Sequence, residues 1–189
     1  MTNIISYISD TLCSHKIIKY EEIDIFKYGL QCFTISVLEI LSILVISLFV
    51  GNFLYTVIFF LAFIPLRMYA GGYHADTKLK CYIVLLIVYI TFSVLMNFIT
   101  YDIITIVIPS SAIITILTIL KYSPIINKKK KVNSIEKNNY RKISIVILFA
   151  ELIIIFSLSF VFTNSKYILS FSLGQSAVSL SMLMALVKI

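Results

Sequence analysis

Long apolar segments alternate with short polar ones along most of this chain. Such segments are typical of helices that cross a lipid bilayer, whose hydrocarbon core takes about 20 residues of helix. One apolar segment, residues 53–66, is shorter than this, so we expect the helix to extend past Pro65 or to draw Arg67 up to the membrane interface. The six predicted spans are residues 29–49, 53–66, 81–99, 103–120, 143–162 and 167–187.

The first 28 residues have a different pattern. Apolar residues recur at helical spacing from Ile4 to Leu12, and charged residues separate the later apolar ones. This predicts an amphipathic helix on the membrane surface. It is not typical of a signal peptide, because it lacks an unbroken apolar core and a small-residue cleavage site. Cys13 and His15 are interpreted as a structural thiol and a surface imidazole, since no glycine-containing loop surrounds them.

The composition agrees with a membrane protein. Sixty per cent of the residues are hydrophobic, the mean hydropathy is +1.01 and only 13% are charged. We therefore predict an all-α integral membrane protein with one polytopic domain over residues 1–189. The three cysteines, Cys13, Cys32 and Cys81, are widely spaced and form no C-x-x-C pair. Neither a disulfide framework nor a metal site is predicted, and no cofactor is expected.

The longest polar interruption in the first half of the chain runs from Leu66 to Cys81 and contains both a histidine and a cysteine. A thiol and an imidazole suffice for nucleophilic acyl chemistry, because the imidazole takes the thiol proton and returns it to a leaving amine. His74 and Cys81 are seven residues apart. On one continuous helix they would be separated by about 10.5 Å along the axis, too far for proton transfer. We therefore expect the chain to turn between them.

The surroundings of Cys81 favour a reactive thiolate. The predicted third span begins at Cys81, and a helix N-terminus stabilises a negative charge. Arg67, Lys78 and Lys80 add positive charge nearby in the sequence. Asp76 is interpreted as a solvated loop residue, with orientation of His74 as the alternative. These features predict that Cys81 is the nucleophile and His74 the base.

Arg67, the Gly71-Gly72 pair, His74 and Cys81, placed between two hydrophobic segments, resemble the signature of the accessory gene regulator B (AgrB) family. The likeness extends to the chain length, the number of apolar segments and a basic loop after Tyr-Ser-Pro. It implies a membrane-embedded cysteine endopeptidase that processes an AgrD-type quorum-sensing propeptide to a cyclic thiolactone. By the same resemblance Arg67 binds a substrate carboxylate or the oxyanion, and the two glycines let the loop bend or the substrate approach.

The distribution of basic residues predicts the orientation in the membrane. If the N-terminus is cytoplasmic, three basic residues lie inside before residue 28, three at 67–80, eight at 121–142 and one at 188. Only Lys166 then lies outside, which satisfies the positive-inside rule. We expect a multi-pass protein of the bacterial cell membrane with both termini and the active site in the cytoplasm.

The loop at 121–142 is strongly basic. Its first expected role is to fix the topology and to attract anionic lipid headgroups, at about 1 kcal/mol for each basic residue near the surface. A second hypothesis is that it recruits an acidic segment of the propeptide. Nucleic acid is not expected as a partner, because no aromatic residues are interleaved. The centre of the loop is Lys128, Lys129, Lys130 and Lys131.

Other features leave alternatives open. Glu39 and Glu151 lie within predicted spans, where a carboxylate is costly, and Pro109 predicts a kink. A non-enzymatic peptide transporter or permease component using these two carboxylates is therefore the main rival, and a membrane scaffold without chemistry is a third hypothesis. Small residues from Gly174 to Ser179 suit close helix packing and are compatible with a homodimer.

Overall fold

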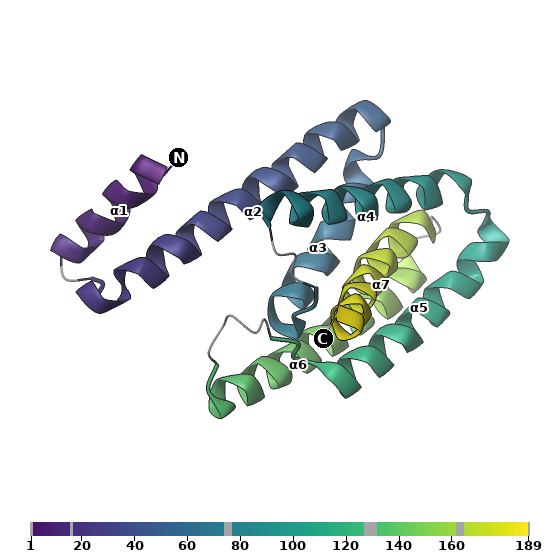
Figure 1. The fold of residues 1–189 in the computed structure, drawn as a ribbon. Coiled ribbons are helices and arrows are strands. Elements are labelled where there is room, and N and C mark those ends of the chain that lie inside the picture. Colours follow the sequence, from purple (N-terminus) through teal and green to yellow (C-terminus); the bar gives the residue numbers. More distant parts are fainter. Residues whose placement is uncertain (1, 16, 74–76, 127–131, 162–164, 189) are drawn as a thin grey trace. The chain divides into compact units, whose positions relative to one another are not determined.

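The computed structural model describes residues 2–15, 17–73, 77–126, 132–161 and 165–188, which form seven α-helices and one 3₁₀ turn (Figure 1). Six helices in this part of the chain are long and apolar enough to cross a membrane. The predicted all-helical class with six spans is confirmed. The elements are α1 (Thr2–Ser14), η1 (Tyr20–Glu22), α2 (Ile23–Val50), α3 (Phe53–Ala70), α4 (Lys78–Phe98), α5 (Tyr101–Tyr122), α6 (Ser134–Val161) and α7 (Ser165–Lys188).

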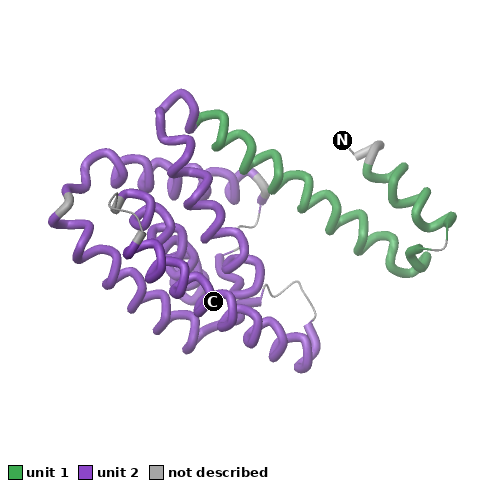
Figure 2. The backbone as a smooth tube through the Cα atoms, turned by 180° about the vertical axis from the view of Figure 1, so that it is seen from behind, with its two compact units in different colours: residues 1–46 green, residues 47–189 purple. Residues whose placement is uncertain are grey.

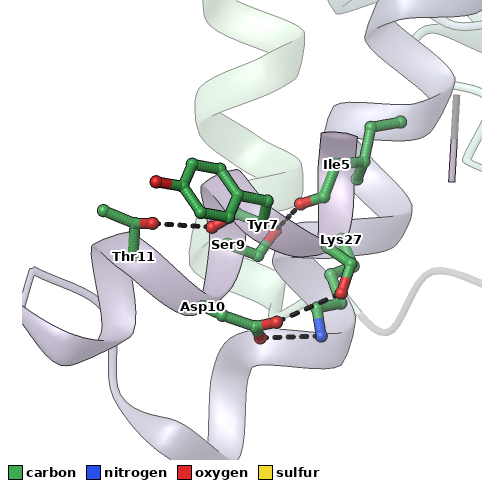
Figure 3. Close-up of polar contacts among 7 residues, drawn as sticks. Ile5, Tyr7, Ser9, Asp10, Thr11 and Lys27 are labelled. Atoms are coloured by element: carbon green, nitrogen blue, oxygen red, sulfur yellow. Dashed lines mark hydrogen bonds and ion pairs between the residues drawn. The ribbon is translucent and has the colours of Figure 1, made fainter. Parts of the chain in front are cut away.

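The chain divides into two compact units, residues 1–46 and 47–189, which are described separately (Figure 2). In the first unit, Asp10 of α1 and Lys27 of α2 form an ion pair of 3.0 Å (Figure 3). Hydroxyls of α1 are satisfied within their own helix, as where Ser9 Oγ donates to the carbonyl of Ile5 at 2.7 Å. Lys27 therefore ties the short first helix to the long second one.

Helix α2 begins at Ile23, before the apolar run that starts near Gly29. Polar residues extend it because a helical backbone needs no apolar side chains at an end that meets water or headgroups. It ends where Gly51 adopts a φ of +77°. The Asn52 amide donates to the Ser47 carbonyl at 3.0 Å and the Gly51 amide to that of Leu48 at 3.3 Å. These two bonds form a Schellman motif, which turns the chain toward α3.

In the second unit, α7 is the central helix. Within its apolar window 61% of residues are buried, against at most 33% in the other five long helices. Its most extensive contacts are with α3 and α5, and α6 also packs against it (Figure 1). The helix that the sequence places last is thus enclosed by helices that precede it.

Helices α3 and α7 approach each other closely. A Cβ added at Gly174 of α7 would lie 2.5 Å from the carbonyl oxygen of Phe59 and 3.0 Å from the Cβ of Ala62. Ser170 Oγ donates to the carbonyl of Tyr55 at 2.5 Å. Small residues allow two membrane helices to pack backbone against backbone, and this is what Gly174 does here.

Apolar clusters lie within the described part of the second unit, and polar side chains are buried with them. Because lipid tails offer no hydrogen bonds, polar groups on spanning helices are satisfied toward the interior. Accordingly, the hydroxyls of Ser111 on α5 and Ser172 on α7 bond to each other. The first cluster consists of Leu66, Ala70, Ile119, Leu148, Val178 and Met182. The second consists of Ala62, Ile155, Ile168 and Phe171.

The two spans that contain a proline continue as helices past it. α3 runs past Pro65 to Ala70, and α5 includes Pro109 within its 22 residues. After Pro109, the Ser110 hydroxyl donates to the carbonyl of Val107 at 3.0 Å and that of Ser111 to Ile108 at 2.8 Å. The kink expected at Pro109 stays a prediction.

Helix α6 begins at Ser134, well before the apolar run. The Asn133 side chain accepts from the Ser134 amide at 3.2 Å, and Glu136 Oε2 accepts from the Asn133 amide at 3.3 Å. The second bond is one half of a capping box, in which the side chain of the third helical residue accepts from the N-cap amide. Arg141 then donates to the carbonyl of Leu120 at the end of α5, at 3.0 Å. Part of the segment predicted as a basic loop is therefore helical.

Candidate functional site

Arg67 lies in the last turn of α3. The predicted second span ends at Leu66, and the helix continues one further turn to Ala70. It stops at Gly71, whose φ is +77° and whose amide donates to the Arg67 carbonyl at 3.2 Å. Arg67 is therefore held by regular helix on the segment that leads into the polar stretch.

Gly71 lies against the chain that follows α5. A Cβ at this position would be 1.9 Å from the carbonyl oxygen of Ile125. The Ile125 amide donates to the carbonyl of Ala70 at 2.9 Å, and the two segments pair in parallel at this point. Backbone contact on this scale requires glycine, because the neighbouring atoms are main-chain atoms that cannot rotate away.

Gly72 lies against the side chain of Arg67. Its φ is +140°, and a Cβ there would be 2.0 Å from Arg67 Nη1 and 2.8 Å from Ser181 Oγ. The missing side chain thus leaves room for the guanidinium. The two adjacent glycines therefore make room for different groups. Gly71 leaves space for the main chain of Ile125, and Gly72 leaves space for the Arg67 guanidinium.

The two terminal nitrogens of Arg67 differ in their environment. Nη2 donates to the carbonyl oxygen of Tyr73. Nη1 is buried and has no hydrogen-bond partner among the described residues. A buried donor without a partner is costly and rare, so it marks a position where an oxygen ligand would be stabilised.

Ser181 of α7 fixes the chain after the glycine pair. The Tyr73 amide donates to the Ser181 carbonyl at 2.9 Å and approaches its hydroxyl oxygen at 3.1 Å. Sequence reasoning missed this residue, because it is one of several serines in the last span and lies more than 100 positions from Tyr73. The small-residue character of that span was the only signal.

Cys81 is the fourth residue of α4. The helix starts after Thr77, whose hydroxyl oxygen accepts from the Lys80 amide at 3.3 Å, and the Cys81 amide donates to the Thr77 carbonyl at 3.1 Å. The Cys81 side chain is exposed, and a thiolate there would interact electrostatically with the Arg67 guanidinium. The structure therefore brings two of the predicted site residues, the arginine and the cysteine, within electrostatic reach of each other.

Several predicted site residues lie outside the described part of the chain. These are His74, Asp76 and the four consecutive lysines Lys128 to Lys131. The residues that border the first gap are described: Tyr73 is bonded to Ser181, and Thr77 caps α4. The second gap begins at residue 127. Two residues before it, the Ile125 amide is bonded to the main chain beside Gly71.

The other histidine and the two other thiols of the sequence, Cys13 and Cys32, belong to the first unit. His15 Nδ1 lies 2.8 Å from the Thr11 carbonyl oxygen, and Cys13 is partly buried. In the described ranges no group of three or more His, Cys, Asp or Glu side chains is placed to hold a metal ion.

The two carboxylates of the rival hypothesis have different surroundings. Glu39 is partly exposed on α2, in the first unit. Glu151 is buried on α6 in the second, where its Oε2 accepts from Gln175 Nε2 of α7 at 3.0 Å.

Comparison with known proteins agrees with the motif. The family model for accessory gene regulator B matches residues 1–185. Accessory gene regulator protein B of Staphylococcus intermedius is 28% identical over 129 residues, covering 68% of this chain and 67% of that protein. A Clostridium perfringens protein described as AgrB-like is 27% identical over 145 residues, covering 75% and 76% respectively. No solved structure matches. The chain is therefore a multi-pass membrane protein of the accessory gene regulator B family, which acts in quorum sensing.

Proposed function

We propose that this chain is a cysteine endopeptidase that cleaves the C-terminal part of a quorum-sensing propeptide at the cytoplasmic face of the membrane. The observation that carries the proposal is the placement of the exposed Cys81 side chain within electrostatic reach of the Arg67 guanidinium, which has a buried nitrogen without a partner among the described residues. A nearby cation favours the thiolate, which is the nucleophilic form of cysteine. Family membership agrees with a role in peptide processing.

The first step is acylation of Cys81. His74 takes the thiol proton, and the sulfur attacks a peptide carbonyl of the propeptide. The C–N bond then breaks, and the imidazolium gives its proton to the departing amine of the C-terminal fragment. The remaining N-terminal part of the propeptide is attached to Cys81 as a thioester.

The second step releases the product. A cysteine thiolate within the bound peptide attacks the thioester carbonyl, and Cys81 leaves as a thiolate. One thioester replaces another, so the acyl group keeps its activation and the peptide becomes a cyclic thiolactone. A site at the membrane boundary that excludes water protects the thioester from hydrolysis.

Arg67 has a defined part in this scheme. Nη2 is engaged with the Tyr73 carbonyl, so the guanidinium plane is fixed by the chain that leads to His74. Nη1 is the donor left for the substrate, as either an oxyanion or a carboxylate ligand. Because the guanidinium is already held by the protein, little reorganisation is needed when the charge develops.

The proposed orientation places this site inside the cell. It follows from the basic residues, fifteen of which lie on one side if the N-terminus is cytoplasmic. Ile125 is bonded next to Gly71, and the run of lysines begins three residues later. An acidic propeptide segment or anionic lipid attracted by these lysines would therefore be concentrated near the site.

The test is mass spectrometry of an acidic-tailed propeptide incubated with the purified protein in liposomes. The wild type should release a C-terminal fragment and carry a covalent adduct on Cys81. Cys81→Ala should do neither, whereas Cys13→Ala, which removes a thiol in the first unit, should process the peptide like the wild type. Helical content by circular dichroism shows that each variant is folded.

Two results would contradict the proposal. One is processing of a bound propeptide by folded Cys81→Ala at the wild-type rate. The other is absence of processing by either protein when the peptide demonstrably binds, accompanied by loss of peptide transport in Glu39→Gln or Glu151→Gln. The second result would favour the transporter hypothesis.

A further inference from the structure

Glu151 and Gln175 form a buried polar pair between the middle parts of α6 and α7. The residues are 5% and 0% exposed, and Gln175 Nε2 donates to Glu151 Oε2 at 3.0 Å. The pair lies between the residues that form the two apolar clusters, since Leu148 and Ile155 flank Glu151 on α6. Its surroundings are therefore of low polarity.

One oxygen of each side chain has no partner among the described residues. Glu151 Oε1 and Gln175 Oε1 are both buried and unbonded there. An ionised carboxylate and an amide carbonyl are both acceptors, so the two oxygens cannot satisfy each other in that state. Leaving a buried acceptor without a donor typically costs about 1–3 kcal/mol, and more for a charged one.

No described cation compensates a charge on Glu151. The carboxyl forms no ion pair, and its interacting polar group is Gln175. Titratable groups on the helices packed against α6 lie in their first or last turns. These are Tyr55, Arg67 and Tyr69 on α3, Tyr101, Asp102, Lys121 and Tyr122 on α5, and Lys166, Tyr167 and Lys188 on α7. On α6 itself they are Glu136, Lys137, Tyr140, Arg141 and Lys142, at least nine positions before Glu151.

We propose that Glu151 and Gln175 are a proton-binding site, in which a proton on Glu151 Oε1 is donated to Gln175 Oε1. With the existing bond from Gln175 Nε2 to Glu151 Oε2, this closes a cyclic pair between a carboxylic acid and a carboxamide. Because both groups are planar, the second bond forms when they share a plane and their two unbonded oxygens face each other. A single proton satisfies both unbonded oxygens and removes the buried charge.

The pair acts as a neutral clamp between α6 and α7. In the low-polarity interior such hydrogen bonds are strong, and no charge has to be desolvated. α7 also carries Ser181, which holds Tyr73, so the clamp fixes the helix on which the candidate site rests. The inference does not depend on the proposed peptidase activity.

Glu151→Gln tests the proposal, because its new amide supplies a permanent donor to Gln175 Oε1 and an acceptor to Gln175 Nε2. Glu151→Leu is the matched control that keeps the size and removes both bonds. Thermal unfolding in detergent should show Glu151→Gln at least as stable as the wild type near neutral pH, because it pays no cost for proton uptake, and Glu151→Leu less stable than Glu151→Gln. The peptide-processing assay is not needed for this comparison.

The pH dependence identifies the proton. Above about pH 4.3 an unfolded glutamate is ionised, so folding of the wild type takes up a proton and stability falls as the pH rises. The folding equilibrium constant should change at most about tenfold per pH unit from this site. The difference between wild type and Glu151→Gln isolates this contribution. Infrared spectroscopy should show a protonated carboxyl band at neutral pH that Glu151→Gln lacks.

Three outcomes would overturn the inference. The first is a Glu151→Gln protein as unstable as Glu151→Leu. The second is the absence of the protonated carboxyl band from the folded wild type at neutral pH. The third is stabilisation of the wild type by sodium chloride over choline chloride that Glu151→Gln abolishes, since the unbonded oxygens would then belong to a monovalent cation site.

Discussion

The guanidinium of Arg67 occupies the space that a side chain at Gly72 would fill, with Nη1 only 2.0 Å from an ideal Cβ at that residue. The absence of a side chain at Gly72 therefore determines where the positive charge of Arg67 can lie. The arrangement also explains why a glycine with a φ of +140° follows a glycine that already ends the helix. It makes the position of the cation sensitive to the smallest possible substitution.

Gly72→Ala should displace the Arg67 guanidinium. The added methyl meets Nη1 and Ser181 Oγ, and the backbone conformation is strained for alanine by about 1–3 kcal/mol. Propeptide cleavage should fall at least tenfold, which corresponds to about 1.4 kcal/mol of transition-state stabilisation. The measurement is the initial rate in liposomes. Gly29→Ala, where nothing lies within 4 Å, should leave the rate unchanged, and equal rates for Gly72→Ala and wild type would rule out a role for this contact.

Gly71→Ala should lower the stability of the second unit. Its Cβ would lie 1.9 Å from the Ile125 carbonyl, and a main-chain atom cannot rotate away. Gly51→Ala is a matched control, because Gly51 has the same φ of +77° with nothing within 4 Å. Thermal unfolding should show a larger loss for Gly71→Ala, by about 1–3 kcal/mol for the overpacking alone. Equal losses would mean that strain, and not the contact with Ile125, sets the cost.

Gly174→Ala should separate α3 from α7. The added methyl would lie 2.5 Å from the Phe59 carbonyl oxygen, so one helix must move by a few tenths of an ångström or more. Overpacking of this kind typically costs about 1–3 kcal/mol. Unfolding in detergent measures the loss, and disulfide trapping between cysteines placed on the two helices measures the spacing. An unchanged midpoint with unchanged trapping would show that the helices are not in close contact there.

The ion pair between Asp10 and Lys27 should make docking of α1 on α2 depend on pH. Hydrogen bonds from Lys27 and Ser6 lower the pKa of the Asp10 carboxyl below its usual 3.8. This contribution is therefore present above the unfolded pKa and is lost as the pH falls through the lower folded value. The protection factors of the α1 amides, which correct for the slower intrinsic exchange in acid, should fall in acid and in high salt, which screens exposed charges. Asp10→Asn should show lower protection than the wild type at neutral pH, and protection factors that are insensitive to both pH and this substitution would contradict the prediction.

Much of the fold was predictable because apolar length is a local property. Six long helices, among them α2 and α7, were predicted from runs of apolar residues that are long enough to cross the hydrocarbon core of a bilayer. The ends of helices were less predictable, since polar residues continue a helix beyond the apolar run. For α6 the Asn133 and Glu136 capping pair carried the signal for an earlier start.

The candidate site was likewise predictable only in part. The sequence alone determined its chemical types, since Arg67, the glycine pair and Cys81 lie within one short polar stretch. Only the tertiary structure decided that Gly72 accommodates the guanidinium, that Ser181 holds Tyr73 and that Glu151 pairs with Gln175. Residue types and hydropathy can be read from the sequence, whereas these contacts depend on which helices pack together, and α7 packs against α3 and α6, which do not form one local segment with it.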